Sequence, residues 1–334
     1  MRHFNIPVFI PELACPFRCV YCNQYTITGS CKTPDVAEVE NIIQKHLSTI
    51  DPAGSRVEVA FFGGSFTGLE GSLQNQYLEI VQPWLKMKVI DGIRISTRPD
   101  YISENILENL RKMGVRAIEL GAQSLNQEVL DKSGRGHTIA DVENAARMIK
   151  SMGFELGLQM MTGLPGDNEE KSLQTARKIV ELKADTTRIY PTLVIRDTPL
   201  AELYIKGAYM PQTLEDASQL CARLYDVFAP AGVKILRMGL HPSDGFFNGE
   251  TLLAGPFHPA FGELVLSKVW LKKISHLPET YSDEKIVIEV NPAEINSAIG
   301  HKAQNRLFLQ KYYKKVKFRA NPDIPRGEYY VDTH

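Results

Sequence analysis

Three cysteines near the N-terminus lie close enough in sequence to bind one metal centre. Cys15, Cys19 and Cys22 fall within eight residues. Cysteine thiolates are the usual ligands of iron–sulfur clusters, and a loop of this length lets all three side chains point inward. Three thiolates on a four-iron cluster leave one iron open to a small molecule. The alternative interpretation is a zinc site that takes its fourth ligand from His3 or Cys31.

The elements that must position these cysteines have the pattern of an α/β fold. Strand-length apolar runs alternate with helical patterns six or seven times, which favours a parallel sheet with right-handed crossovers. The strands are expected at residues 4–10, 57–62, 92–96, 115–120, 155–161, 187–193 and 234–238. The clearest helical patterns cover residues 102–113, 139–152 and 170–182.

Unusual residues follow the predicted strands at their carboxyl ends. Besides the cysteine motif, they occur at residues 63–65, 97–100, 123–124 and 163–166. In a parallel β/α barrel these ends meet on one face, where such folds place cofactor and substrate. An open sheet would gather fewer of them near a switch point. We therefore expect a closed or partly closed barrel over residues 1–245.

Composition excludes several classes of protein. Hydrophobic residues make up 43% of the chain and charged residues 23%, which excludes disorder, collagen and coiled coil. No apolar stretch approaches the roughly 20 residues of a membrane-spanning helix, and Glu12 lies where a signal peptide would be apolar. We expect a cytoplasmic protein without membrane contacts. Five cysteines argue against a disulfide framework, and Cys31 and Cys221 are expected to be ordinary thiols.

The cysteine motif, with Tyr21 before its last member, resembles the radical S-adenosylmethionine (SAM) enzymes. Residues 62–67 resemble the glycine-rich loop of that superfamily, whose backbone receives the methionyl amino group of SAM. The resemblance implies a partial parallel (β/α)6-type barrel. It also implies that Tyr21, Gly63, Gly64 and Ser65 contact the cofactor, and glycine suits close backbone approach.

Further motifs resemble two relatives within the superfamily. Residues 96–101, 118–124, 135–137 and 163–166 are similar to the radical domain of the Elongator catalytic subunit and, more distantly, to oxygen-independent coproporphyrinogen oxidases. The similarity covers roughly residues 1–200. It implies that Gln123 and Arg135 contact the ribose and carboxylate region of SAM, with Arg98 in the neighbouring loop.

Two positions depart from the relatives' pattern. Ser96 stands where the relatives commonly have Glu, and Gln159 stands where the porphyrin enzymes have an acidic residue. Serine and glutamine can still hydrogen-bond a ribose hydroxyl, so both are predicted cofactor contacts. Glu119 is a candidate to compensate for the missing acids.

The resemblance also implies a mechanism. A reduced 4Fe–4S cluster bound by the three cysteines donates one electron to SAM, and the product is a 5′-deoxyadenosyl radical that abstracts hydrogen from a substrate. The electron would come from a donor such as flavodoxin or ferredoxin. The protein's own task is to position the reactants and to exclude solvent.

The alternation ends after about residue 245, where glycine and proline become frequent. We expect residues 246–283 to form a connection that covers the barrel mouth, with His258 and Glu263 toward the substrate. A structural turn is the equal alternative for these two residues.

Residues 284–334 are predicted to form a small basic α+β unit, with strands at 285–290 and 315–319 and a helical stretch from Pro292. No acid occurs between Glu294 and Asp323, which indicates a polyanion partner. The basic residues of this stretch are Lys302, Arg306, Lys311, Lys314, Lys315, Lys317 and Arg319.

Residues 298–307 resemble the helix–loop–helix of KH domains, whose Gly-x-x-Gly loop clamps a nucleic-acid backbone. Ala303 stands at the second glycine. The resemblance implies that Gly300, Lys302, Arg306 and Lys314 contact RNA. The alternative is a solvated basic helix face.

Three functions remain open. The first is a radical enzyme that modifies RNA, with tRNA as the expected substrate. The 334 residues leave no room for the acetyltransferase domain of the Elongator subunit, so acetyl transfer is not expected. The second is a radical SAM enzyme for a small molecule such as a tetrapyrrole. The third is a non-catalytic iron–sulfur or RNA-binding protein.

Overall fold

The structure is a computed structural model that describes residues 2–10, 19–23, 33–51, 54–240, 244–247, 249–281 and 284–332. Cys15 and Cys31 lie outside the described residues. The chain forms two compact units. The first consists of Met1–Gln212 and Val227–Pro256, and the second of Thr213–Asp226 and Phe257–His334.

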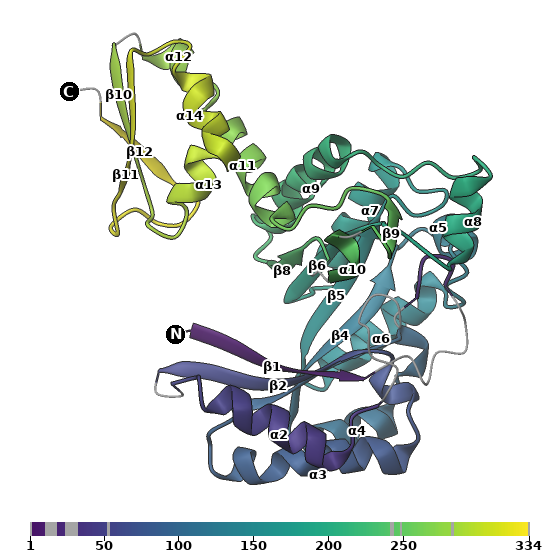
Figure 1. Ribbon diagram of the computed structural model, residues 1–334. Coiled ribbons are helices and arrows are strands. Elements are labelled where there is room, and N and C mark those ends of the chain that lie inside the picture. Colours follow the sequence, from purple (N-terminus) through teal and green to yellow (C-terminus); the bar gives the residue numbers. More distant parts are fainter. Residues whose placement is uncertain are drawn as a thin grey trace. The chain divides into compact units, whose positions relative to one another are not determined.

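Seven parallel strands form the curled sheet of the first unit (Figure 1). Their order is β1-β2-β3-β4-β5-β6-β8, so neighbours in sequence are neighbours in the sheet. This confirms the expected α/β fold and partial barrel, including all seven expected strands. The strands are β1 (Arg2–Ile10), β2 (Ser55–Gly63), β3 (Gly92–Thr97), β4 (Val115–Gln123), β5 (Glu155–Thr162), β6 (Thr186–Pro191) and β8 (Lys234–Met238).

Helices connect these strands and begin at side-chain caps. Asp35 and Thr138 each form a capping box at the start of their helices, because their side chains accept from the backbone N–H three residues on. Gly114 and Gly153 follow two of the helices with φ of 84° and 80°, a backbone that favours glycine. The α-helices between the strands are α2 (Val36–Leu47), α3 (Gly71–Lys86), α4 (Glu104–Lys112), α5 (Gln127–Lys132), α6 (Ile139–Ser151), α7 (Glu169–Glu181), α8 (Pro199–Ile205) and α9 (Leu214–Phe228).

Charged side chains pair across the strands on the inner face of the sheet. Glu58 on β2 accepts from Arg94 on β3 at 3.1 Å, and Arg94 also donates to Glu155 on β5 at 2.7 Å. Arg56 contacts the same two carboxylates at 2.6 and 3.2 Å. Burial raises the pKa of Glu58, but Arg94 and Arg56 outweigh it and hold the pKa below its ordinary value. Parallel strands therefore share a buried ionic layer beneath their carboxyl ends.

The expected connection over residues 246–283 is divided between the two units. β9 (Leu252–Ala254) pairs antiparallel with β7 (Val194–Ile195) in the first unit, beside the short helix α10 (Asp244–Phe247). The rest contains a regular helix, α11 (Phe261–Ile274), in the second unit. The boundary thus lies at Pro256 rather than at residue 245, because the glycine-rich run before it is tied to β7.

The second unit has a three-stranded sheet and its own apolar core. Its central strand β10 (Lys285–Val290) pairs parallel with β11 (Lys315–Ala320) and antiparallel with β12 (Tyr329–Asp332), a strand that the sequence pattern did not predict. Trp270 of α11 and Ile288 of β10 are buried in the core. The remaining helices are α12 (Leu277–Thr280), α13 (Ile295–Ile299) and α14 (Gln304–Leu309).

Candidate active site

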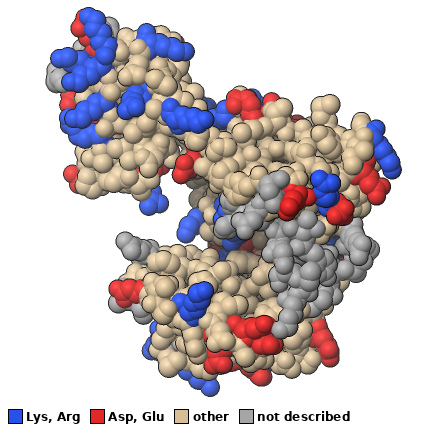
Figure 2. Space-filling model, viewed as in Figure 1, with Lys and Arg blue, Asp and Glu red and all other residues tan. Residues whose placement is uncertain are grey.

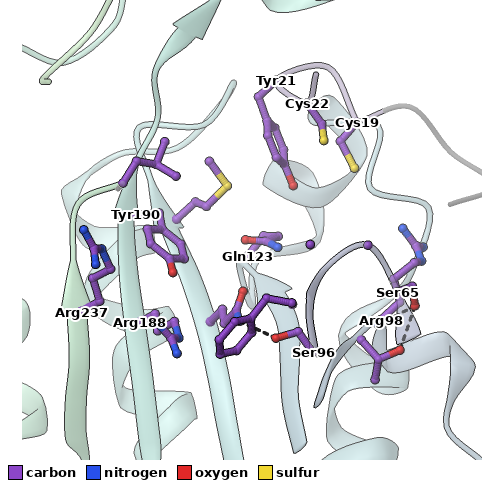
Figure 3. Close-up of a pocket in the computed structure, with 18 of the residues that line it drawn as sticks. Cys19, Tyr21, Cys22, Ser65, Ser96, Arg98, Gln123, Arg188, Tyr190 and Arg237 are labelled. Atoms are coloured by element: carbon purple, nitrogen blue, oxygen red, sulfur yellow. Dashed lines mark hydrogen bonds between the residues drawn. The ribbon is translucent and has the colours of Figure 1, made fainter. Parts of the chain in front are cut away.

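A cavity of about 630 Å³ lies at the carboxyl ends of the seven strands. Figure 3 shows Cys19, Tyr21 and Cys22 on one side of it, with Gln123 near the middle. All nine predicted cofactor residues and the two described cysteines of the motif, Cys19 and Cys22, line this cavity. The parallel arrangement therefore brings together predicted side chains that are up to 140 residues apart in the chain, Cys19 and Gln159.

Cys19 and Cys22 lie in one turn, where the N–H of Cys22 donates to the carbonyl of Cys19 at 3.0 Å. Cys19 is buried and Cys22 is partly exposed. Arg135 places a positive charge beside the first sulfur, since its Nη1 donates to Cys19 Sγ at 3.5 Å. Burial raises the pKa of the neighbouring Tyr21 phenol well above its ordinary value, so Tyr21 stays neutral.

His3, the suggested fourth ligand of a zinc site, lies elsewhere. It belongs to the amino-terminal end of β1 and contacts Glu58 Oε2 at 2.7 Å. Because the cysteine turn follows the carboxyl end of the same strand, His3 cannot join it. Within the described ranges, no three His, Cys, Asp or Glu side chains form a group that could hold a metal ion.

The Gly63–Gly64 backbone faces the cavity at the end of β2. Gly63 has φ of 111°, and a Cβ there would lie 2.4 Å from the carbonyl oxygen of Ile10. The N–H of Gly64 donates to the same oxygen at 2.7 Å. Only glycine allows β1 to approach this closely, and no side chain then separates this backbone from the cavity.

Ser65 joins the loops after β2 and β3. Its hydroxyl lies 2.8 Å from the hydroxyl of Thr97 and accepts from the N–H of Arg98 at 3.1 Å. The Arg98 guanidinium binds both carboxylate oxygens of Asp100, at 2.9 and 2.8 Å, and donates to the carbonyl of Arg135 at 2.9 Å. Arg98 thus lines the cavity but also positions the segment that carries Arg135.

The side-chain positions of Gln123 and Arg135 depend on Gly121, which both side chains contact. A Cβ at Gly121 would lie 2.8 Å from Arg135 Nη2 and 2.9 Å from Gln123 Nε2. Arg135 Nη2 instead donates to the carbonyl of Gly121 at 2.7 Å. Gln123 has φ of 62° at a shift in the β4–β5 register, a left-handed backbone that is unusual for a residue with a side chain. Such strain is typical of functional sites.

Ser96 and Gln159, the two departures from the relatives' pattern, lie together. Gln159 Nε2 is 3.4 Å from Ser96 Oγ and donates to Glu119 Oε2 at 3.0 Å. Glu119 itself is not among the cavity-lining residues. Arg188 binds both of its carboxylate oxygens, at 2.6 and 3.1 Å. Glu119 therefore does not replace the missing acids as a direct contact; it orients Gln159 and Arg188.

The far wall of the cavity contains functional candidates that the sequence analysis missed. It includes Arg188 and Tyr190 of β6 and Arg237 of β8 (Figure 3). These residues were interpreted only as parts of strands. One signal in the sequence could have identified Arg188: it is a charged residue within a buried strand. Burying a charge costs free energy unless the side chain has a partner. The apolar part of this wall consists of Met161, Leu193, Ile195 and Leu240.

The predicted substrate residues belong to the second unit and not to the cavity. His258 packs edge to face on His301, with the ring centres 5.3 Å apart. Burial and the neighbouring charges of His301 and Lys302 lower the pKa of His258. Lys314 forms an ion pair with Glu284. The other predicted residues of this group are Glu263, Gly300, Lys302 and Arg306.

Comparison with known families gives two adjacent matches. A family model described as the Radical SAM superfamily matches residues 10–179. A model of a Radical SAM C-terminal domain matches residues 184–270. None of the helices in the described part of the chain has the length and hydrophobicity to cross a membrane.

Curated relatives with similar sequences include tRNA-modifying proteins. A tRNA uridine(34) acetyltransferase of Dehalococcoides mccartyi is 26% identical over 266 residues, which is 70% of this chain and 58% of that protein. Its namesake in Methanocaldococcus jannaschii is 36% identical over 38% of this chain and 24% of its own length. The chain therefore spans about a quarter to three fifths of the length of these relatives.

Solved structures share the fold at low sequence identity. The archaeal Methanocaldococcus infernus Elp3 aligns with a TM-score of 0.65 and 22% identity, over 81% of this chain and 63% of that one. Streptococcus suis SuiB bound to S-adenosylmethionine aligns with a TM-score of 0.52 and 14% identity, over 78% of this chain and 54% of that one. Both alignments extend well beyond a single supersecondary motif.

Proposed function

Since the chain belongs to the radical SAM superfamily and is an enzyme of that family, we propose that it carries out radical modification of RNA and that tRNA is its substrate. The observation that carries the proposal is the alignment over 70% of the chain with a protein named tRNA uridine(34) acetyltransferase.

The radical SAM family uses a 4Fe–4S cluster and SAM. The cavity wall fits both groups. Two cysteine side chains come from one turn, a backbone without side chains lies at Gly63–Gly64, and Gln123 and Arg135 converge at Gly121. Cys15 would complete the set of thiolates. When bound, the two cofactors supply one-electron chemistry that generates a radical able to abstract hydrogen.

The protein's side chains orient the cysteine turn, bind the cofactor and shield the cavity from water. Arg135 bridges the cysteine turn and the end of β4, since one guanidinium contacts both Cys19 Sγ and the Gly121 carbonyl. The Ser96–Gln159 pair presents hydroxyl and amide groups that can bind ribose oxygens. The apolar side chains on the far wall exclude water from the same cavity.

The second unit supports the RNA part of the proposal. Along the chain, α13 and α14 follow β10 and precede β11. The turn that joins the two helices has left-handed backbone at Gly300, Lys302 and Ala303, with φ of 85°, 51° and 59°. The N–H groups of Gly300, His301 and Ala303 already donate to Asn296, Ser267 and Gly300 within the unit. The likeness to the KH loop therefore lies in the position and backbone of the turn, and phosphate contacts would come mainly from its side chains. We include this KH-like unit in the proposal.

The second unit carries many basic side chains. Figure 2 shows Lys and Arg gathered over the second unit. Lys314 and Arg319 are paired with Glu284 and Glu289, respectively. Among the described residues, no ion pair involves the exposed side chains of Lys302, Arg306, Lys311, Lys315 and Lys317. Unpaired cations on one small unit suit a phosphate backbone.

The proposal is tested with anaerobically reconstituted and reduced protein, by assaying 5′-deoxyadenosine with and without total tRNA. Formation that tRNA stimulates, and that Cys19→Ala abolishes, is the expected result. Lys302→Ala with Arg306→Ala should remove the stimulation and reduce the salt dependence of tRNA binding, whereas Lys86→Ala with Lys112→Ala, on exposed helix positions of the first unit, should not.

Formation that is indifferent to tRNA would contradict the RNA assignment and direct the search to small molecules such as a tetrapyrrole. No formation with a fully reconstituted cluster would favour a non-catalytic iron–sulfur or RNA-binding protein. The proposal also includes a cytoplasmic location and a flavodoxin or ferredoxin as electron donor.

A further inference from the structure

The cavity has two chemically different walls. The ends of β1 to β4 supply the cysteine turn, the glycine backbone, Gln123 and the segment leading to Arg135. The ends of β5 to β8 supply apolar side chains together with Arg188, Tyr190 and Arg237, and Figure 3 shows these three grouped opposite the cysteines. The cofactor residues predicted from sequence occupy mainly the first wall. The second wall is therefore available to another part of the bound molecules.

The charge on the cavity wall has one sign. Among the described residues that line the cavity, four are arginines and none is Asp or Glu. Arg98 is paired with Asp100 at 2.8 Å, and Arg135 donates to a backbone carbonyl and a sulfur. An enclosed wall with an excess of fixed positive charge attracts anions.

The charge of Arg188 is already neutralised by the carboxylate of Glu119. Its guanidinium binds both oxygens of Glu119 and lies over the ring of Phe62, 5.1 Å from the ring centre. In the ionic layer, three arginines face three glutamates, so their formal charges cancel. The arginines of this layer are Arg56, Arg94 and Arg188, and the glutamates are Glu58, Glu119 and Glu155.

Arg237 does not belong to that layer. It lies on β8, the last strand of the sheet, and is half-buried. Among the described residues, its one hydrogen bond runs from Nε to the Gly239 carbonyl at 3.0 Å, and it forms no ion pair. This bond fixes the plane of the guanidinium and leaves its two Nη groups to other partners. A half-buried cation without a carboxylate costs free energy unless a ligand supplies the counter-charge.

We propose that Arg237 binds an anionic group of a molecule held in the cavity, with the hydroxyl of Tyr190 as a second donor. The group is a phosphate of the nucleotide substrate, because a guanidinium fork matches phosphate geometry and the carboxylate of SAM is expected on the opposite wall, at Gln123 and Arg135. Arg237 is thus a specificity-determining residue of the far wall. The inference rests on the proposed function, which assigns SAM and a nucleotide to this cavity.

The test compares two pairs of probes by calorimetry on the reconstituted protein. Uridine 5′-monophosphate is compared with uridine, and SAM with decarboxylated SAM. The wild type should bind uridine 5′-monophosphate about tenfold more tightly than uridine, the contribution of one charge-assisted contact. Arg237→Gln should lose this preference and Arg237→Lys should keep part of it. Arg147→Gln, on the surface of α6, is the matched control and should retain it.

Any preference for SAM over decarboxylated SAM should be the same in the wild type and in Arg237→Gln. The inference is overturned if the wild type does not prefer uridine 5′-monophosphate to uridine, if Arg237→Gln keeps that preference while its thermal midpoint is unchanged, or if Arg237→Gln loses only a preference for SAM. The binding measurement needs no turnover. A protein that binds the anion through Arg237 yet forms no 5′-deoxyadenosine would therefore contradict the proposed function and leave this inference standing.

Discussion

Gly121 shows how a single residue without a side chain can organise a site. The carbonyl of Gly121 accepts from Arg135, and the space above its Cα is occupied by the ends of Arg135 and Gln123. Arg135 in turn reaches Cys19. The geometry of three predicted cofactor contacts thus depends on the absence of one methyl group.

Gly121→Ala should weaken SAM binding about tenfold or more, because the new Cβ displaces the side chains of Arg135 and Gln123. The measurement is a SAM titration of the reconstituted protein. Gly71→Ala is the control, since a Cβ at Gly71 meets nothing within 4 Å. Unaltered SAM affinity in Gly121→Ala would show that these two side chains do not determine binding.

His137 makes the stability of the folded protein depend on pH. Burial, together with the charges of Arg135 and Arg98, lowers the pKa of His137 to about 3 from an ordinary 6.5. The unfolded chain therefore binds a proton between these values while the folded chain does not. This contribution to stability is present above pH 6.5 and is lost as the pH falls toward 3.

In the variant His137→Gln, the free energy of unfolding should fall less steeply as the pH decreases below 6.5. Between pH 7 and 4.5, the free energy of unfolding of the wild type should fall relative to that of the variant by up to about 3 kcal/mol, since each pKa unit corresponds to about 1.4 kcal/mol. Urea denaturation at pH 7, 5.5 and 4.5 measures the free energy of unfolding of both proteins. Parallel curves would mean that His137 is not neutral when buried.

At the scale of elements, the strands are joined by ion pairs as well as by backbone hydrogen bonds. Glu119 on β4 binds Arg188 on β6 and Arg94 on β3, so one carboxylate links strands on both sides of its own. Its side chain is only 1% exposed. Removing one member of such a buried set leaves the others without a counter-charge.

Glu119→Gln should therefore lower the free energy of unfolding by about 3 kcal/mol, the typical result of breaking a buried pair. Chemical denaturation provides the measurement. Glu128→Gln makes the same change in an exposed carboxylate that binds Lys132 and Lys171, and it should alter the midpoint little. Equal effects of the two substitutions would show that the inner layer contributes no more than surface pairs.

At the scale of the whole molecule, the chain has two compact units with separate cores. The second core surrounds Trp270, which is 2% exposed, and the first contains fully buried Leu158 of β5. Each core buries its own apolar surface, so each unit has its own source of cooperativity.

Calorimetry of the full chain should accordingly show two transitions. Trp270→Ala should lower one of them and Leu158→Ala the other, each by the several degrees that a loss of about 3 kcal/mol produces. A single transition that both variants lower equally would indicate one cooperative unit.

The sequence alone determined the features that depend on local spacing. The strands, the capped helices and the strand-end motifs have short-range patterns, and the order of parallel strands follows the order of the chain. The predicted cofactor residues met in one cavity for the same reason, because the carboxyl ends of consecutive parallel strands lie at one edge. β12 has a weaker pattern and was not predicted.

Only the tertiary structure decided which polar groups are already committed to partners. Glu119 is bound by Arg188 across 69 residues of sequence, and Arg237 lacks such a carboxylate among the described residues. Neither fact is visible in local spacing, since partners on different strands are set by sheet register and by the alternation of side chains. The same holds for Lys314, which resembles its unpaired neighbours in sequence but is paired with Glu284 in space. Sequence spacing thus located the site, and long-range pairing determined which of its charges can bind a ligand.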